Sequence, residues 1–165
     1  VTLVMGKCDS EPPVFVNTVK VQSAKDMYDA VIERADSMDI IVKAAAVADY
    51  RPKNVSSEKV KKQDGNMSIE LERTDDILKT LGERKNGQFI CGFSMETENM
   101  LENSRKKLEK KNCDMIVANN LKQDGAGFGG NTNIVTLITK DDEVQLEKMT
   151  KDEVAEKIFD FILSR

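Results

Sequence analysis

The sequence predicts an α/β fold with a mostly parallel sheet, and two observations support this prediction. Short apolar runs typical of buried strands alternate along the chain with amphipathic stretches typical of helices, and this alternation is characteristic of βαβ units. The length of 165 residues suits one core. We therefore expect a single domain over residues 1–165, with a Rossmann-like three-layer arrangement in which helices cover both faces of the sheet.

The expected strands are short runs of apolar or alternating β-branched residues. In chain order they are Val1–Met5, Phe15–Val21, Ile40–Val47, Phe89–Phe93, Met115–Ala118 and a late hairpin of Asn133–Thr139 with Val144–Leu146. The run Ile40–Val47 is the most apolar, and we expect it to be a central strand covered on both faces. Because Val1–Met5 already reads as a strand, we expect the chain to begin partway through its fold.

Capping signals and apolar periodicity predict four helices. Ser23 with Asp26 is a variant of the capping box and should open a helix that ends near residue 37. Thr74 should cap a short helix over residues 75–81, and a long helix is expected over residues 96–111. A full capping box at Thr150 and Glu153 should open the last helix. The apolar face of that helix is expected to be Val154, Ile158, Phe161 and Ile162.

A projecting β-hairpin flap is expected over about residues 56–72, where an Asp-Gly pair separates two alternating runs. Alternation would place Lys59 and Lys61 on the same face of the first strand. Two ammonium groups on one face are suited to binding an anion. They are equally typical of a solvated edge strand that lysines protect from pairing.

Composition and charge exclude several classes of function. The chain contains no histidine, which removes Ser/His and Cys/His nucleophile pairs and histidine metal ligation. Its three cysteines, Cys8, Cys91 and Cys113, share no C-x-x-C spacing, so we expect neither a disulfide framework nor a zinc site, and a cytoplasmic location fits best. We expect Cys91 to be a core residue. A net charge of -4 indicates no nucleic-acid partner, and no apolar run is long enough for a membrane span.

Residues that follow buried strands are the first candidates for a site, because ligands of open α/β sheets bind beyond the carboxyl ends of the strands. Asp49 follows one such run, and its carboxylate is suited either to Mg²⁺ against a phosphate or to a helix or turn cap. Lys107 and Lys111 have no acidic residue one turn before them, so they are suited to a common anion or to a solvated face. The G-x-G-x-x-G run at 125–130 is followed by strand-like sequence, which argues against a dinucleotide fingerprint.

Several motifs in series closely resemble the bacterial phosphopantothenoylcysteine synthetases. They are Lys43–Pro52, the Glu58–Lys62 run, Gly92–Glu98, the Lys107 and Lys111 helix, Asp114–Asn119 and Asn133–Ile138. The resemblance spans essentially all 165 residues in unbroken order. These synthetases usually form the C-terminal part of a bifunctional coenzyme A biosynthesis protein that also carries a decarboxylase.

The resemblance implies a ligase that uses CTP and Mg²⁺. In that family the carboxylate of 4′-phosphopantothenate attacks the α-phosphate of CTP and releases pyrophosphate; the amine of cysteine then displaces CMP from the acyl-cytidylate to form the amide. Such chemistry depends on positioning and on neutralising charge, which suits a chain without histidine. The resemblance also implies a homodimer, and we expect the flap to contribute to the dimer contact.

The resemblance also assigns site residues. Asp49 would hold the metal-bound triphosphate, and Lys59 would lie on the flap over the acyl-cytidylate. The other implied nucleotide contacts are Lys43, Asp75, Asp76, Ile77, Leu78, Phe93, Lys107 and Lys111. We expect the Asp49 carboxylate, Lys59 and the lysine pair of the long helix to converge above one edge of the sheet.

The sequence departs from the family pattern in two places. The family has a Gly-rich loop and a segment with an active-site asparagine ahead of the strand that matches Val1–Met5, so we expect this domain to be incomplete at its N-terminus. A fragment that binds the nucleotide without turnover is therefore an alternative. A nicotinamide-dependent oxidoreductase on the same layered fold is another. Asp75 and Asp76 replace an Asn-Pro-Asp-like pattern, which leaves the role of Asp75 open.

Overall fold

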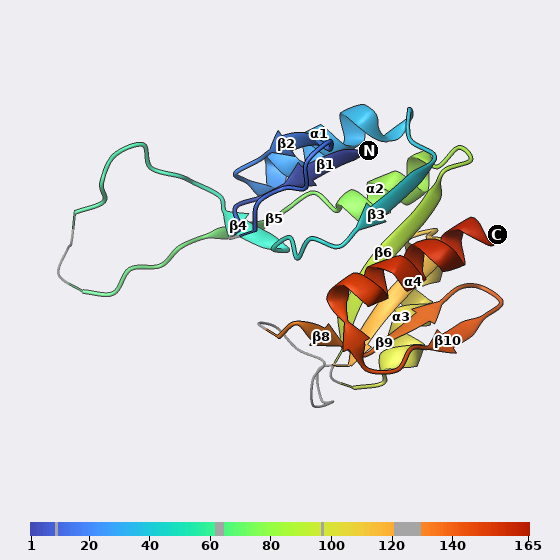
Figure 1. Cartoon of the computed structure of the whole chain (residues 1–165). Coiled ribbons are helices and arrows are strands. Elements are labelled where there is room, and N and C mark those ends of the chain that lie inside the picture. Colours follow the sequence, from blue (N-terminus) through green and yellow to red (C-terminus); the bar gives the residue numbers. More distant parts are fainter. Residues whose placement is uncertain (9, 62–64, 97, 121–129) are drawn as a thin grey trace. The chain divides into compact units, whose positions relative to one another are not determined.

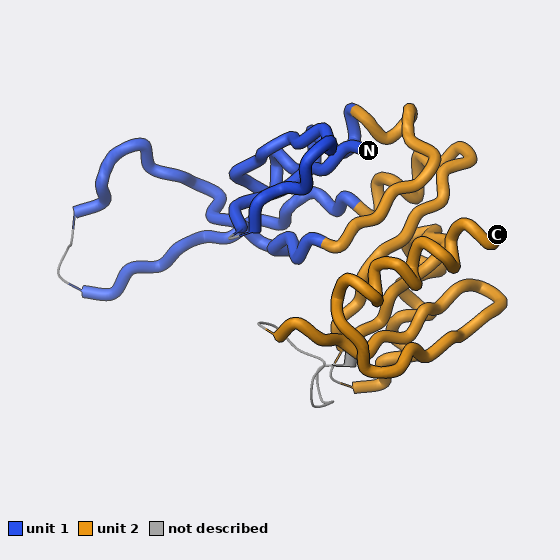
Figure 2. The backbone as a smooth tube through the Cα atoms, in the orientation of Figure 1, with its two compact units in different colours: residues 1–33, 45–77 blue, residues 34–44, 78–165 orange. Residues whose placement is uncertain are grey.

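The structure is a computed structural model that describes residues 1–8, 10–61, 65–96, 98–120 and 130–165 (Figure 1). The chain divides into two units (Figure 2): unit 1 comprises Val1–Glu33 and Ala45–Ile77, and unit 2 comprises Arg34–Ala44 and Leu78–Arg165. The expectation of a single domain over residues 1–165 stays a prediction. The predicted α/β class is confirmed, because strands and helices alternate along most of the chain.

Unit 2 is built on a five-stranded sheet with the order β10-β9-β7-β6-β3. The strands are β3 (Ile40–Lys43), β6 (Phe89–Glu96), β7 (Met115–Asn120), β9 (Val135–Ile138) and β10 (Glu143–Gln145). The first three are mutually parallel, and the last two run antiparallel to their neighbours, as the predicted late hairpin requires. A short antiparallel pair, β8 (Thr132–Asn133) with β11 (Met149–Thr150), lies between β7 and the last helix in the sequence.

Helices pack on this sheet through residues that their periodicity places on one side. Helix α4 (Lys151–Leu163) buries Val154, Ile158 and Ile162 against the strands, as predicted. Their partners on the sheet are Cys91, Met115, Val117, Val135 and Leu137. Because alternate strand residues point to opposite faces, Gly92 and Ile116 belong to the other face, and Leu78 at the start of α2 (Ile77–Arg84) lies against Gly92 there. No helix in the described part of the chain combines the length and apolar character needed to cross a bilayer.

Unit 1 contains a parallel strand pair, an antiparallel strand pair and most of helix α1 (Ala24–Ala35). The parallel pair is β1 (Thr2–Met5) with β2 (Asn17–Lys20), and the antiparallel pair is β4 (Tyr50–Pro52) with β5 (Leu71–Arg73). The capping-box variant is confirmed: the Asp26 amide donates to Ser23 Oγ at 3.1 Å, and the Ser23 amide donates to the Asp26 carboxylate at 2.9 Å.

The prediction for the strand over residues 40–47 was wrong in its length and its place. Strand β3 ends at Lys43, and it forms an edge of the five-stranded sheet rather than its centre. Residues 44–46 are all alanine and are exposed. Alanine is depleted in strands because its small side chain contributes little packing to a pleated surface, so the apolar composition of this run did not predict a continuing strand.

Two predicted helix starts were also wrong. The Thr74 hydroxyl donates to the carbonyl of Ala48 at 2.6 Å, so Thr74 continues the β4–β5 pairing instead of capping a helix, and α2 begins at Ile77. Helix α3 (Met100–Lys110) begins four residues later than expected, because Glu96 is still paired with Asn120 as the last residue of β6.

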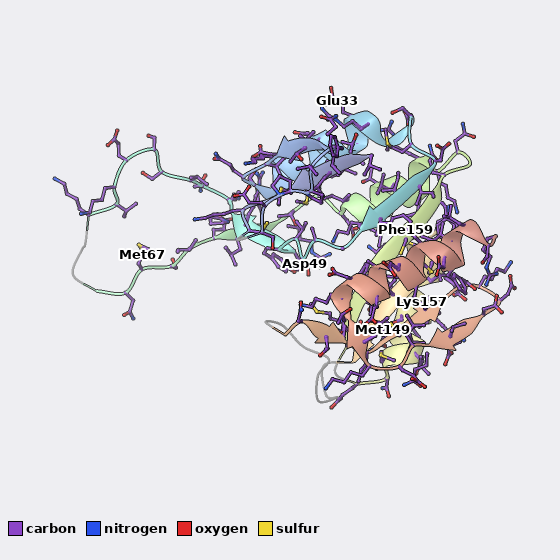
Figure 3. All side chains as sticks on the ribbon, in the orientation of Figure 1. Glu33, Asp49, Met67, Met149, Lys157 and Phe159 are labelled. Carbon is purple, nitrogen blue, oxygen red and sulfur yellow. The ribbon has the colours of Figure 1, made fainter. Side chains whose placement is uncertain are left out.

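The flap prediction was wrong in its strands. Residues 53–61 and 65–70 form no strand (Figure 1). On this side of the β4–β5 pair, the Lys53 amide donates to the Glu70 carbonyl at 3.0 Å. The predicted turn lies largely outside the described residues. Val60 is 62% exposed, and Met67, which Figure 3 labels, is 72% exposed. An isolated two-stranded ribbon is marginally stable.

Gly82 allows α2 to approach the end of α3. A Cβ at residue 82 would lie 1.9 Å from the backbone carbonyl oxygen of Lys111, and Asn112 Nδ2 donates to the Gly82 carbonyl at 2.9 Å. We predict that Gly82→Ala lowers the free energy of unfolding by about 1 to 3 kcal/mol, as overpacking does, although alanine favours helices over glycine by about 1 kcal/mol. Chemical denaturation measures this. Gly130→Ala is the control, because no atom of the described residues lies within 4 Å of a Cβ added there; equal stability of the two variants would contradict the prediction.

The predicted capping box of α4 is present and makes stability depend on pH. The Thr150 amide donates to the Glu153 carboxylate at 2.8 Å, and this bond, with one from the Thr150 hydroxyl, holds the pKa of Glu153 below its usual value of 4.5. Because the folded-state pKa is lowered, the stabilisation is present at neutral pH and is lost as the pH falls through that lowered value.

We predict that Glu153→Ala lowers the free energy of unfolding at pH 7 more than Glu156→Ala, which removes an exposed carboxylate from the same helix. The difference between the two variants should shrink at acid pH, below the folded-state pKa. Denaturant titrations at several pH values measure it, and a difference that is constant with pH would contradict the assignment.

Candidate functional site

Pairing of β4 with β5 brings the predicted carboxylates of unit 1 to one place. Asp49 directly precedes β4, and its carbonyl accepts a hydrogen bond of 3.0 Å from the Thr74 amide, which directly follows β5. The chain continues from Thr74 into Asp75 and Asp76 before α2 begins. Residues that are about 25 positions apart in the sequence are thus neighbours, at the end of the strand pair where Figure 3 labels Asp49.

The carboxylates of this group are open to solvent and suit a hard cation only in part. Asp49 and Asp75 are exposed, and carboxylate oxygens are ligands that Mg²⁺ accepts. In the described ranges, no group of three or more His, Cys, Asp or Glu side chains is arranged to hold a metal. A cation at Asp49 would therefore need further oxygen ligands from a substrate, which is how Mg²⁺ is usually bound with phosphates.

A lysine that the sequence analysis missed lies near these carboxylates. The hydrogen bond to Asp29 raises the pKa of the Lys25 ammonium, and the Asp75 carboxylate adds to this shift. Lys25 is in the first turn of α1 and also lies 5.2 Å from the centre of the Tyr28 ring. No motif marks Lys25 in the sequence, because its nearness to Asp75 arises only from the fold of unit 1.

Lys59 lies in the exposed segment between β4 and β5, outside any strand. The flap strand that was predicted to carry Lys59 is not present, because residues 53–61 form no strand. Its convergence with Asp49 stays a prediction.

Unit 2 brings four of the predicted residues together around the end of β3. Lys43 ends β3 opposite Gly92, and Phe93 is the next residue of β6. The Lys107 ammonium of α3 donates to the Phe93 carbonyl at 2.9 Å. Leu78 lies against the Gly92 backbone, and a Cβ there would be 2.7 Å from Leu78 Cδ2. These contacts join α2 and α3 to the neighbouring strands β3 and β6.

The end of β3 explains why Lys107 can reach this carbonyl. Because the register ends with Lys43 opposite Gly92, β6 from Phe93 to Glu96 has β7 on one side and no described strand on the other. A backbone carbonyl at such an edge needs another donor. The ammonium has three N–H donors, so one bond to the carbonyl leaves donor capacity for an anion.

Lys111 follows Lys107 by one turn and ends the helix. Its amide donates to the Lys107 carbonyl at 3.0 Å, and both lysines are half-buried. The Lys107 ammonium reaches β6 through its bond to the Phe93 carbonyl. Whether the two ammonium groups bind a common anion with Asp49 and Lys59 stays a prediction.

Two of the three cysteines, Cys91 and Cys113, are buried and are not suited to be nucleophiles. Cys91 is buried in β6, and burial raises the pKa of its thiol to about 12. Burial, with a contribution from Asp114, also raises the pKa of Cys113 to about 12. The thiolate is the reactive form of cysteine, so a raised pKa makes these thiols unreactive. The burial of Cys91 confirms the prediction that it is a core residue. The Gly-rich run at 125–130 lies, except for Gly130, outside the described residues.

Comparison with known proteins places these features in a family. Residues 1–165 match the family model described as the DNA/pantothenate metabolism flavoprotein C-terminal domain. The coenzyme A biosynthesis bifunctional protein CoaBC of Bacillus subtilis is 53% identical over 131 residues, which cover 79% of this chain and 32% of that protein. CoaBC of Vibrio cholerae is 39% identical over 165 residues, which cover 98% of this chain and 41% of that protein. The chain thus spans less than half the length of these relatives.

A solved structure agrees with the sequence matches. The crystal structure of the C-terminal domain of CoaBC superposes with a TM-score of 0.81 at 46% identity, covering 98% of this chain and 71% of that chain. The resemblance to synthetases of coenzyme A biosynthesis is therefore confirmed. Fold and sequence together show that the chain belongs to the family of the DNA/pantothenate metabolism flavoprotein C-terminal domain, as the C-terminal region of CoaBC does.

Proposed function

We propose that this chain carries the phosphopantothenate–cysteine ligase activity of coenzyme A biosynthesis and that it uses CTP. The observation that best supports the proposal is the contact between Lys107 and the Phe93 carbonyl, because it joins two residues that the family resemblance assigned independently to the nucleotide. Activation of a carboxylate by a nucleotide requires charge neutralisation and positioning more than proton transfer, which agrees with a chain that has no histidine.

In this proposal the carboxylates of unit 1 serve the metal-bound triphosphate. Asp49 would hold Mg²⁺ together with phosphate oxygens, since a single exposed carboxylate cannot complete the shell of the ion. Bound Mg²⁺ would neutralise negative charge on the phosphates. Asp75 and Asp76 follow the same strand pair, and the bond of Thr74 to the Asp49 carbonyl keeps them beside Asp49.

The residues at the start of α2 would contact the nucleotide through their backbone. The side chains of Ile77 and Leu78 are buried, at 3% and 5% exposure, so they have little surface to offer a polar ligand. The first amides of a helix have no partner within the helix and are suited to polar acceptors. We propose the same backbone role for Lys43.

The lysines would neutralise charge at different stages. Lys107 and Lys111 would bind phosphate oxygens from the end of α3. Lys59 would act from the segment between β4 and β5, where its exposed side chain can approach the acyl-cytidylate after that intermediate has formed. Cysteine would then attack the activated carbonyl, and CMP would leave with its electron pair.

We predict that the intact protein, given CTP, Mg²⁺, 4′-phosphopantothenate and cysteine, releases pyrophosphate and then CMP. Lys59→Gln should slow amide formation about a hundredfold or more, the usual effect of removing a group that stabilises transition-state charge. Rapid-quench chromatography of pyrophosphate, CMP and the amide measures both steps. Lys61→Gln is the matched control, because it lies two residues away in the same exposed segment.

The outcomes separate the alternatives. Unchanged turnover in Lys59→Gln would remove Lys59 from the mechanism. Binding of CTP without CMP release by the chain of residues 1–165 would favour a fragment that binds the nucleotide without turnover. Thermal stabilisation by NADPH but not by CTP would favour a nicotinamide-dependent oxidoreductase.

We also propose that the chain acts in the cytoplasm as a homodimer, fused to a decarboxylase in the parent protein. The exposed apolar side chains of the segment between β4 and β5 support a protein contact there, because large apolar groups rarely cluster in solvent without a partner. They are Val55, Val60, Met67 and Ile69, and Leu71 at the start of β5 is exposed as well.

We predict that light scattering on the purified chain gives the mass of a dimer. Val55→Asp, which puts a charge at an 85% exposed position, should shift the mass toward a monomer. Phe159→Asp changes an exposed apolar residue of α4 (Figure 3) and serves as the control. A monomeric mass for the unmodified chain would contradict the prediction.

A further inference from the structure

We propose that Glu96 and Asn103 form a positioning pair that sets the rotation of α3 and thereby orients Lys107 toward its anion. The proposal rests on the proposed function, because it needs Lys107 to bind the nucleotide. Neither residue was singled out from the sequence as a site residue, and both belong to unit 2.

The pair attaches the first turns of α3 to the end of β6. The Glu96 carboxylate accepts hydrogen bonds from Asn103 Nδ2 at 3.3 Å and from Ser94 Oγ at 3.0 Å. Asn103 Nδ2 also donates to the Glu98 carbonyl at 3.1 Å. One amide side chain of the helix therefore contacts both the last residue of the strand and the connection that follows it.

In the described residues, no N-cap side-chain hydrogen bond holds the start of α3. The N-cap residue Asn99 lies in the left-handed region, with φ 49°, and its side chain makes no capping hydrogen bond. Ser, Thr, Asp or Asn side chains at this position usually bind the first free amides and fix the start of a helix. In the described part of the chain, the link from Asn103 to Glu96 ties this end of α3 to the strand.

Asn103 and the two lysines share one ridge of the helix. Residues four apart lie on the same side of a helix, so Asn103, Lys107 and Lys111 form a row at successive turns. Asn103 binds the end of β6, and Lys107 binds the Phe93 carbonyl at 2.9 Å. Two contacts along one ridge resist rotation of the helix about its axis, whereas a single contact acts as a pivot.

The chemistry of Glu96 separates a positioning role from a catalytic one. Both of its oxygens accept from neutral donors within the protein, so the pair needs hydrogen-bond acceptors rather than negative charge. A glutamine at residue 96 can accept from Asn103 and donate to Ser94, whose hydroxyl serves as donor or acceptor. A metal ligand or general base would not tolerate that change.

The experiment measures steady-state kinetics of the intact protein with CTP, Mg²⁺, 4′-phosphopantothenate and cysteine. We expect Asn103→Leu and Glu96→Ala to raise the KM for CTP about tenfold, the equivalent of one lost hydrogen bond, with kcat changed much less. Glu96→Gln should restore the unmodified KM. Calorimetric titration of the same variants with CTP should show the matching loss of affinity.

The control removes another link between α3 and the sheet. Arg105 pairs with Glu143 of β10 at 2.6 Å, from a different side of the helix. Glu143→Gln weakens this exposed pair, which is expected to contribute little to stability, and it should leave the KM for CTP unchanged. Thermal unfolding identifies any variant that does not fold; Asn103→Ala then replaces Asn103→Leu.

A double-mutant cycle tests whether Asn103 acts through Lys107. Added to Lys107→Met, Asn103→Leu should raise the KM for CTP by much less than tenfold, because coupled residues are not additive. Full additivity, or failure of Glu96→Gln to restore the KM, would overturn the positioning role. Unmodified protein without CMP release, or Lys107→Met with a normal KM for CTP, would instead overturn the proposed function.

Discussion

Strand β6 continues past the end of its neighbour β3, and the candidate site of unit 2 depends on this difference in length. After Gly92 pairs with Lys43, the edge of β6 that faced β3 has no described strand beside it. The Phe93 carbonyl is exposed to a new donor there, and the Lys107 ammonium supplies it. The ammonium group of Lys107 is thereby held beyond the carboxyl end of β3, in the parallel part of the sheet. Open α/β folds bind their ligands beyond the carboxyl ends of parallel strands.

The close packing beneath that edge keeps the lysine ridge in place. Gly92 and Gly82 have no side chains, so Leu78 approaches β6 and the carbonyl of Lys111 approaches α2. The links of Asn103 and Asn112 to neighbouring elements lie at opposite ends of α3. A densely packed interior transmits small shifts instead of absorbing them. Residues outside the site therefore influence the position of the lysine ammonium groups of α3.

In unit 1, a short antiparallel strand pair brings the candidate site residues together. Strands β4 and β5 make three register pairs, and Thr74 extends them by binding the backbone of Ala48 and Asp49. This brings Asp49 beside Asp75 across a long connecting segment. The segment itself has few neighbours to pack on, which explains why its alternating sequence did not become the strands that its Asp-Gly turn signal indicated.

The sequence by itself determined the α/β class, the order of most elements, both capping boxes and the apolar face of α4, because these depend on residue spacing within one turn or one strand. It also indicated Asp49, Lys59 and Lys107 as candidate site residues through their positions and spacing, and Phe93 through the family resemblance. Tertiary structure alone decided where β3 and β6 end, that Thr74 extends a strand pair, and that Lys107 reaches Phe93. These features arise from partners between 14 and 50 residues apart in the chain, and local spacing carries no information about a partner that only the folded sheet supplies.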